Sequence, residues 1–433
     1  MNITDSLSSI LSKNSKIDGR LIILFFLITY FSVIYISSFF MPYYQFWAYL
    51  GVPSMSPSFA DLRNLTSGLE CYRQGLDPLI NNPCDPWDRP MNYPRIWLGL
   101  SSLGLDQSHT FLLGIVQAII FYACLFMIII KRLNVGEGLF YGLILCSPAV
   151  MFAVERGNND IIVFVFLSLS FFLMQKRRIL PYFLILMVSI LKLFPIVSII
   201  GALREEKTRS IFIVLITCTL FLIYVMSIWK DVILIGATVP RATDISYGSR
   251  VIFDMLNHLI QRISSFGISE TLRTIFSFTA VLFFLVGSYL ANKVGFIQKN
   301  IQNHLITTQY IDSFRIGAII YIGTFIIGNN FDYRLIFLIF TLPQLLAWIK
   351  SKNSLIHCSV FLLIAILFTM WSSFFSVWFS GLFSYVSMEK IGEYSVSLIE
   401  EIINWLIFGC FTYLLLLTLP DWLKSLLRLK TPR

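Results

Sequence analysis

The feature that most constrains this chain is a series of apolar runs, each about long enough to cross a lipid bilayer. A transmembrane helix needs about 20 predominantly apolar residues, and such runs recur throughout the 433 residues. Hydrophobic side chains make up 57% of the chain and charged ones 13%, against about 45–50% and about 25% in soluble domains. The sequence therefore predicts an all-α integral membrane protein and excludes a soluble enzyme.

Single apolar runs occupy residues 21–41, 110–130, 138–154, 161–174, 211–229, 272–291, 315–328, 335–349, 355–379 and 398–419. A further stretch, 179–203, has basic clusters at both ends and the sequence Lys192-Leu193-Phe194-Pro195 in its middle. Proline interrupts a helix, so two short helices forming a hairpin are predicted there. With the hairpin counted as two, we expect about 12 transmembrane or half-membrane helices.

The expected organisation is one polytopic membrane domain at 21–420 between cytoplasmic tails at 1–20 and 421–433. Two large exoplasmic loops are expected, at 42–109 and 230–271. Cytoplasmic lysines mark the orientation of membrane proteins, and this topology places 11 of the 14 lysines on the cytoplasmic side. Both termini are therefore expected in the cytosol. The oligomeric state is left open by the sequence.

The arginines do not follow the lysines. On this topology ten of them lie outside or at the outer membrane edge: Arg63, Arg73, Arg89, Arg95, Arg156, Arg241, Arg250, Arg262, Arg273 and Arg334. The planar guanidinium fork suits phosphate and carboxylate groups. A solvated surface and an anionic ligand on the outer face are both consistent with this distribution. Because most basic residues flank apolar runs, no nucleic-acid partner is expected.

Asp61 is the first residue of the outer loop that attracts attention. Apolar residues from Phe59 to Tyr72 recur at helical spacing, which predicts a short amphipathic helix lying on the membrane, with Asp61 near its start. An aspartate in the first turn of a helix is often only a cap or a dipole partner. The position of Asp61 in this helix therefore does not decide between a structural role, as a cap, and a functional one.

Three further polar groups fall at outer ends of apolar runs. They are Glu155-Arg156-Gly157-Asn158-Asn159-Asp160, then Lys192 at the hairpin tip, then Asn329-Asn330-Phe331-Asp332-Tyr333-Arg334. Charged groups at membrane depth are costly unless they face water or a polar cavity. The first group is read either as a site or as a solvated turn in which Asp160 caps the next helix.

A lone carboxylate among cations suits transfer of a group from a phosphate leaving group to a hydroxyl. The carboxylate accepts the hydroxyl proton, and arginine or lysine stabilises the charge that grows on the phosphate. The seven cysteines and four histidines show no spacing typical of a metal or redox site. Outside the membrane no nucleotide donor is available, so a lipid would have to present the donor.

Several passages together resemble a known family. They are Asp61-Leu62-Arg63, Gly75-Leu76-Asp77-Pro78, Asn92-Tyr93-Pro94, Glu155 to Asp160, Leu191-Lys192-Leu193-Phe194-Pro195, and Asn330 to Arg334. Their order and spacing resemble the GT-C superfamily of polytopic glycosyltransferases. Within it they are most similar to the polyprenyl-phosphate-mannose-dependent alpha-mannosyltransferases of bacteria, the group that includes the phosphatidylinositol-mannoside enzyme. Leu79 and Arg95 depart from that pattern.

The resemblance implies a GT-C architecture and an inverting transfer, most simply of mannose, from a polyprenyl-phosphate donor to a lipid or glycan acceptor. It implies a multi-pass protein of a bacterial inner or plasma membrane, with the site facing the periplasm or exterior. Asp61 would be the general base. Where enzymes of this superfamily have a metal-binding D-x-D motif, this chain has Asp61-Leu62-Arg63, with arginine in place of the second aspartate. We therefore expect no cofactor and no divalent metal. Donor-phosphate ligands would be Lys192, Arg241, Arg250 and Arg156; the substrate pocket would comprise Arg63, Tyr93, Arg95, Glu155, Asn158, Asn159, Asp160, Asp332, Tyr333 and Arg334.

Two other classes stay open: a transporter or flippase for an anionic lipid or solute, and a non-catalytic subunit of an envelope polysaccharide system. Transporters often contain internal repeats and midplane charges, whereas the polar groups here fall mainly on one face. Cys71 and Cys84 are the two cysteines of the first outer loop. In an oxidising compartment they could form a disulfide, and two free thiols are the alternative.

Overall fold

The computed structural model describes residues 17–176, 179–264, 266–295, 310–351, 354–384 and 389–429, and these are nearly all α-helical. The tails predicted at 1–20 and 421–433 lie partly outside these residues. The chain forms two compact units. Unit 1 comprises Met1–Val52, Arg132–Val150 and Arg241–Arg433; unit 2 comprises Pro53–Lys131 and Met151–Pro240.

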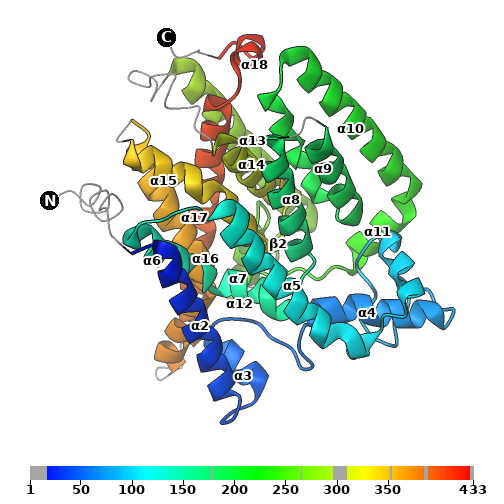
Figure 1. The fold of residues 1–433 in the computed structure, drawn as a ribbon. Helices are drawn as coiled ribbons and strands as arrows, with labels where there is room; N and C mark the ends of the chain where they lie inside the picture. Colours follow the sequence, from blue (N-terminus) through cyan, green and yellow to red (C-terminus); the bar gives the residue numbers. More distant parts are fainter. Residues whose placement is uncertain are drawn as a thin grey trace. The chain divides into compact units, whose positions relative to one another are not determined.

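Unit 2 is built from short and medium helices. Its elements are α4 (Ala60–Arg73), η1 (Arg95–Leu103), η2 (Gln107–His109), α5 (Thr110–Cys124), η3 (Leu125–Ile129), most of α7 (Pro148–Arg156), α8 (Asp160–Met174), α9 (Leu180–Leu191), η4 (Phe194–Arg204), α10 (Lys207–Ser227) and α11 (Trp229–Thr238). Helix α9 packs against α8, η4 and α10, and α5 packs against α8 and α4 (Figure 1).

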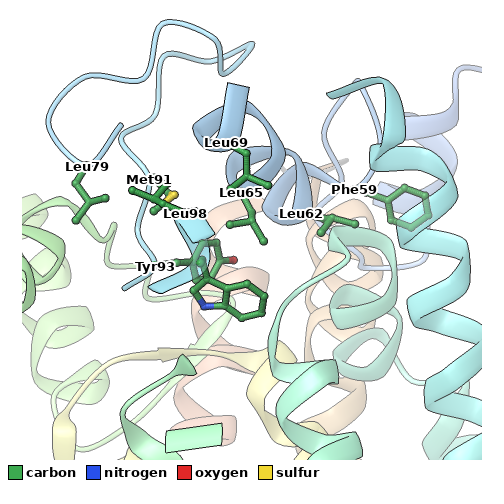
Figure 2. Close-up of a cluster of buried hydrophobic side chains, with 9 residues drawn as sticks. Phe59, Leu62, Leu65, Leu69, Leu79, Met91, Tyr93 and Leu98 are labelled. Carbon is green, nitrogen blue, oxygen red and sulfur yellow. The ribbon is translucent and has the colours of Figure 1, made fainter. Parts of the chain in front are cut away.

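Helix α4 occupies the region predicted to be amphipathic. Leu62, Leu65 and Leu69 project from one side of it, and each is at most 5% exposed (Figure 2). This side packs into a core that includes Met91 and Tyr93. Burial of each leucine contributes about 2 kcal/mol. The helix was therefore predicted correctly, but its apolar side packs within the protein rather than on the membrane, because the following loop folds back over it.

Unit 1 contains the longer helices. Its elements are α2 (Gly19–Ser37), α3 (Tyr43–Tyr49), α6 (Val135–Leu145), β1 (Ser246–Tyr247), α12 (Val251–Ile263), α13 (Glu270–Val294), α14 (Ile311–Ile327), β2 (Asn330–Phe331), η7 (Asp332–Thr341), α15 (Leu342–Lys350), α16 (Ile356–Ser384), α17 (Glu389–Leu417) and α18 (Asp421–Leu426). Helices α16 and α17 lie side by side, and α17 also packs against α13 and α14 (Figure 1). Strand β1 pairs antiparallel with β2, with Ser246 opposite Phe331.

Among the described residues, seven helical segments are long and apolar enough to cross a membrane. They are Gly19–Ser37, Gln107–Ile129, Lys207–Ser227, Glu270–Val294, Asp332–Lys350, Ile356–Leu382 and Ser395–Leu417. Each coincides with a predicted run, so the chain is an α-helical membrane protein. The predicted total of about 12 is not reached. Asp160–Met174, Leu180–Leu191 and Phe194–Arg204 are shorter apolar helices, α14 has 17 residues, and the run at 138–154 is a broken pair, α6 and α7.

In the three least buried of the seven segments, fewer than a fifth of the residues of the apolar window are buried inside the protein. Only 17% of the apolar window of Gly19–Ser37 is buried inside the protein, 11% of that of Lys207–Ser227 and 17% of that of Glu270–Val294. Contiguous apolar surface on this scale marks a membrane or protein interface. The exposed apolar side chains of these helices fit the assignment of the chain as a membrane protein.

The break predicted in the 179–203 stretch is present. Helix α9 ends at Leu191, and Lys192 adopts an extended conformation with φ −153° and ψ 124°. Pro195 then lies in the first turn of η4, where its missing N–H costs no helical hydrogen bond. The interruption fixes Lys192 at the end of α9, in position for the site described next.

Candidate active site

Asp61 lies in the first turn of α4, and the backbone around it is tightly constrained. Phe59 precedes the helix in a left-handed conformation, and its N–H donates to the carbonyl of Glu155 at 3.2 Å. Gly157 has a φ of +57°, and a Cβ there would lie 3.0 Å from Cβ of Leu62. A residue without a side chain is needed at this turn, which brings the end of α7 against the start of α4.

The two carboxylate oxygens of Asp61 have different surroundings. Oδ2 accepts a hydrogen bond from Nδ2 of Asn158 at 2.6 Å. Oδ1 lies 3.9 Å from Nη1 of Arg89 and 3.9 Å from Nη1 of Arg156. These separations are about 1 Å longer than a charge-assisted hydrogen bond, so the attraction is Coulombic only. Among the described residues, no hydrogen bond reaches Oδ1, and this oxygen can accept a proton from a bound hydroxyl.

Arg89 is held in place by its other contacts. Its Nε and Nη2 donate to the two oxygens of Asp85, at 3.2 and 3.0 Å, and Nη2 also donates to the carbonyl of Ala60 at 2.6 Å. Asp85 is itself buried and accepts from Asn64. The Nη1 group of Arg89 is thereby directed at Asp61.

Arg156, the second arginine beside Asp61, is also held in place by other contacts. Its Nε donates to the carbonyl of Pro53 at 3.0 Å and lies 3.8 Å from Oε2 of Glu155, while Nη1 contacts the sulfur of Met55. The side chain is 13% exposed. Two positioned guanidinium groups therefore flank one carboxylate oxygen, with little freedom to collapse onto it.

On the side of Asp61 that carries Oδ2, the Asn158 side chain connects the carboxylate to an ion pair between Lys192 and Asp160. Nζ of Lys192 lies 2.6 Å from Oδ1 of Asp160, whose side chain is fully buried, and donates to Oδ1 of Asn158 at 3.3 Å. The same ammonium group lies 5.8 Å from the centre of the Tyr93 ring. The alternative reading of Asp160 as a cap is not seen: Asn159 precedes α8, and it makes no capping hydrogen bond.

Unit 2 thus brings together most of the predicted site residues that it contains. Direct contacts link Asp61, Arg156, Asn158, Asp160 and Lys192, with Glu155 and Tyr93 beside them. Sequence reasoning placed Arg89 on the outer face but did not include it in the site. Nothing in the sequence of this loop indicated that Arg89 pairs with Asp85 or lies beside Asp61.

Three other predicted residues of unit 2 have different positions. Arg95 joins two carboxylates, donating to both oxygens of Asp77 at 2.9 and 2.7 Å and to Asp231 at 2.9 Å. Arg63 follows Asp61 in α4, where burial lowers the pKa of its guanidinium. The Asn159 side chain is buried, and neither of its polar atoms has a hydrogen-bond partner within the described part of the chain.

The remaining predicted phosphate ligands belong to unit 1 and form an ion-pair network there. Glu270 accepts from Arg241 at 3.0 Å and from Arg250 at 3.4 Å. Arg273 donates to Asp254 at 2.6 Å. A cavity of about 190 Å³ is lined by Arg241, Ala242, Thr243, Asp254, His258, Glu270, Arg273 and Asn329.

The last predicted group follows strand β2 of unit 1. The N–H of Asp332 donates to the carbonyl of Ile245 at 3.0 Å, and its side chain is buried. Arg334 donates to the side chain of Asn330, and the Tyr333 ring stacks on Phe331 with centroids 5.6 Å apart. Asp332, Tyr333 and Arg334 thus form the first turn of η7, directly after strand β2.

Cys71 and Cys84 form a disulfide, with Cα atoms 5.8 Å apart. This decides between the bridge and the two free thiols that the sequence left open. The bridge ties the last turn of α4 to the loop that carries Asp85 and Arg89. It therefore braces the helix that presents Asp61 and the segment that presents one of its cations.

No group of three or more His, Cys, Asp or Glu side chains suited to a metal ion occurs in the described ranges. The chemistry available at Asp61 is proton transfer beside positive charge.

Comparison of the chain with protein-family models, with curated proteins and with solved structures found no match.

Proposed function

We propose that the protein is an inverting glycosyltransferase of GT-C architecture. It transfers a sugar, most simply mannose, from a polyprenyl-phosphate donor to a lipid or glycan acceptor on the exoplasmic face of a bacterial inner or plasma membrane. One observation carries the proposal. Asp61 presents an oxygen free of hydrogen bonds within the described chain, between two positioned guanidinium groups, on a membrane protein.

In the proposed step, Oδ1 of Asp61 removes the proton of the acceptor hydroxyl as that oxygen attacks the anomeric carbon. The new glycosidic C–O bond forms while the bond from the anomeric carbon to the phosphate oxygen breaks. Its electron pair leaves with the polyprenyl phosphate. Attack opposite the leaving group inverts the anomeric configuration. General-base catalysis of this kind contributes about 10²–10⁴-fold.

The cations supply the second half of the chemistry. Arg89 and Arg156 place fixed positive charge beside the carboxylate that takes the proton. The phosphate departs on the opposite face of the sugar, so the preorganised charge that stabilises it comes from other cations. Lys192 is neutralised by buried Asp160, which makes it a weaker phosphate ligand than the sequence suggested. Arg241 and Arg250 stay proposed ligands of the donor phosphate, because their shared carboxylate, Glu270, is exposed and an exposed ion pair is more easily displaced than one with a buried partner.

The test is sugar transfer in membranes supplied with polyprenyl-phosphate mannose. Asp61→Asn keeps the shape of the side chain and removes the base, so we expect kcat to fall by about 10²-fold or more. Asp77→Asn is the matched control, since Asp77 lies in the same loop but pairs with Arg95, and it should retain activity. Near-normal transfer by Asp61→Asn would refute the assignment.

A second function, ion-coupled transport or lipid flipping, is favoured by a different observation. Asp332, Glu400 and Glu401 of unit 1 are at most 3% exposed and lie within candidate spans. Buried carboxylates in spans often mark ion or proton pathways. Uptake of an anionic solute by proteoliposomes, or lipid scrambling in them, that is lost in Glu400→Gln and retained in Asp61→Asn would support transport over transfer.

A further inference from the structure

The side chain of Asn158 connects Asp61 to the ion pair behind it. Asn158 is 2% exposed. Its Nδ2 donates to Oδ2 of Asp61 at 2.6 Å, and its Oδ1 accepts from the backbone N–H of Asp160 at 2.9 Å and from Nζ of Lys192 at 3.3 Å. One amide group therefore faces a carboxylate on one side and two donors on the other.

This pattern permits only one orientation of the amide. If the group were rotated by 180°, its carbonyl oxygen would face the carboxylate of Asp61, and its NH₂ would face an N–H and an ammonium group. Like would face like in every contact. The two donors of Asp160 and Lys192 thus determine that Nδ2 of Asn158 points at Asp61.

The support behind Asn158 is rigid. Lys192 and Asp160 form a pair at 2.6 Å in which the carboxylate is fully buried, and separating such a pair leaves an uncompensated buried charge. The carbonyl of Asn158 also accepts from Gln117 at 2.7 Å. Backbone and side chain of Asn158 are therefore both held before any substrate arrives.

We propose that Asn158 is a positioning residue that occupies Oδ2 of Asp61, so that Oδ1 alone accepts the proton from the acceptor. The Lys192–Asp160 pair acts through Asn158 by fixing its amide. This rests on the proposed glycosyl transfer, and it gives Lys192 a role in orientation rather than in phosphate binding. Asn158 itself neither gains nor loses a proton in the step.

The first experiment compares Asn158→Ala and the isosteric Asn158→Asp with wild type in the polyprenyl-phosphate mannose assay. Both remove the donor to Oδ2. We expect kcat to fall about tenfold or more with donor KM changed less than about threefold, because orientation in the transition state is lost and ground-state binding is kept. Asn292→Ala, which removes another buried amide with two backbone hydrogen bonds, is the control and should leave kcat unchanged.

The second experiment is a double-mutant cycle. Asp160→Asn with Lys192→Met removes both charges and leaves none unpaired. This pair of changes should lower kcat about tenfold in the wild-type background and less than about twofold on top of Asn158→Ala, because a group that acts through Asn158 has nothing left to orient. Additive losses, or a raised donor KM with unchanged kcat, would overturn the inference.

The outcomes separate this inference from the function on which it rests. If Asp61→Asn transfers sugar as wild type does, the proposed function fails. If Asp61→Asn is inactive while Asn158→Ala and Asn158→Asp match wild type, the function stands and the positioning role of Asn158 is wrong. Thermal midpoints of all variants in detergent identify any that are merely unfolded.

Discussion

In unit 2 the nearest arginine nitrogens stay 3.9 Å from Oδ1 of Asp61, whereas in unit 1 Arg273 lies 2.6 Å from Asp254 and Arg241 lies 3.0 Å from Glu270. Both clusters contain carboxylates and guanidinium groups. In unit 1 these groups satisfy one another. The two arginines beside Asp61 are instead bound elsewhere, Arg89 to Asp85 and Arg156 to the carbonyl of Pro53.

The difference shows how a reactive carboxylate can be kept beside positive charge. An arginine free to rotate would close on Asp61 and form a bidentate pair, as Arg95 does with Asp77. Holding the guanidinium groups by other acceptors prevents that collapse. A sequence in which arginine and aspartate merely occur together does not distinguish the two arrangements, since the distinction depends on what else each arginine binds.

The largest effect that would test this contrast is expected at Arg156. Arg156→Gln should lower kcat/KM between about a hundredfold and a thousandfold, because a fixed charge beside the reacting groups is lost. Arg73→Gln, which removes an α4 arginine paired with Asp106, should change kcat/KM less than threefold. Equal losses in the two variants would mean that general surface charge, not the position of Arg156, supports transfer.

A smaller effect is expected from removing the disulfide, which holds together the helix that carries Asp61 and the loop that carries Arg89. Closing a loop between residues 13 apart stabilises by about 3 kcal/mol, and the bridge braces α4. The double variant Cys71→Ser/Cys84→Ser should therefore lower the thermal midpoint and make the 74–94 segment sensitive to protease. Cys218→Ser, at an exposed free thiol, is the control. Alkylation of Cys71 and Cys84 without reductant would contradict the bridge.

Much of the fold followed from the apolar pattern, while the site followed only in part. Seven runs became spanning helices, and Pro195 marked the break after Lys192. The total was overestimated because apolar runs of 11 to 15 residues do not reach spanning length in the structure. Apolarity records burial from water, and it does not distinguish lipid from protein interior.

The composition of the site shows the same limit. The segment from Glu155 to Asp160 and Lys192 were predicted together, and the structure places them in contact. Arg89 was not among the predicted site residues and Arg95 was, because two arginines six residues apart in one loop carry the same signal. The structure places Arg89 beside Asp61 and pairs Arg95 with Asp77 and Asp231. Their partners, Asp85 for one and Asp77 with Asp231 for the other, depend on tertiary packing that the loop sequence does not reveal.

Glu270 provides a smaller test, in unit 1. Its carboxylate is exposed and bridges Arg241 and Arg250, and ion pairs this exposed to solvent contribute little to stability. If these arginines bind the donor phosphate, Glu270 competes with it. Glu270→Gln should then lower donor KM by up to about threefold, and the difference should shrink at high salt. A raised donor KM would show that Glu270 helps to bind the donor. The carboxylate of unit 1 would then have a functional role, and its direct pairing with arginine would no longer distinguish it from Asp61.

The smallest expected effect concerns Asp77, the carboxylate of unit 2 that pairs with Arg95 on both its oxygens. Hydrogen bonds from Arg95 hold the pKa of Asp77 below its ordinary value. The unfolded chain therefore takes up this proton at a higher pH than the folded one, so the pair stabilises fully above about pH 4 and its contribution is lost as pH falls through the folded pKa. Because both side chains are about a third exposed, the contribution is under about 1 kcal/mol. The thermal midpoints of wild type and Asp77→Asn should differ slightly at pH 7, and the difference should shrink as pH falls below about 4; a difference that does not shrink on acidification would mean that shape rather than charge at Asp77 supports the loop.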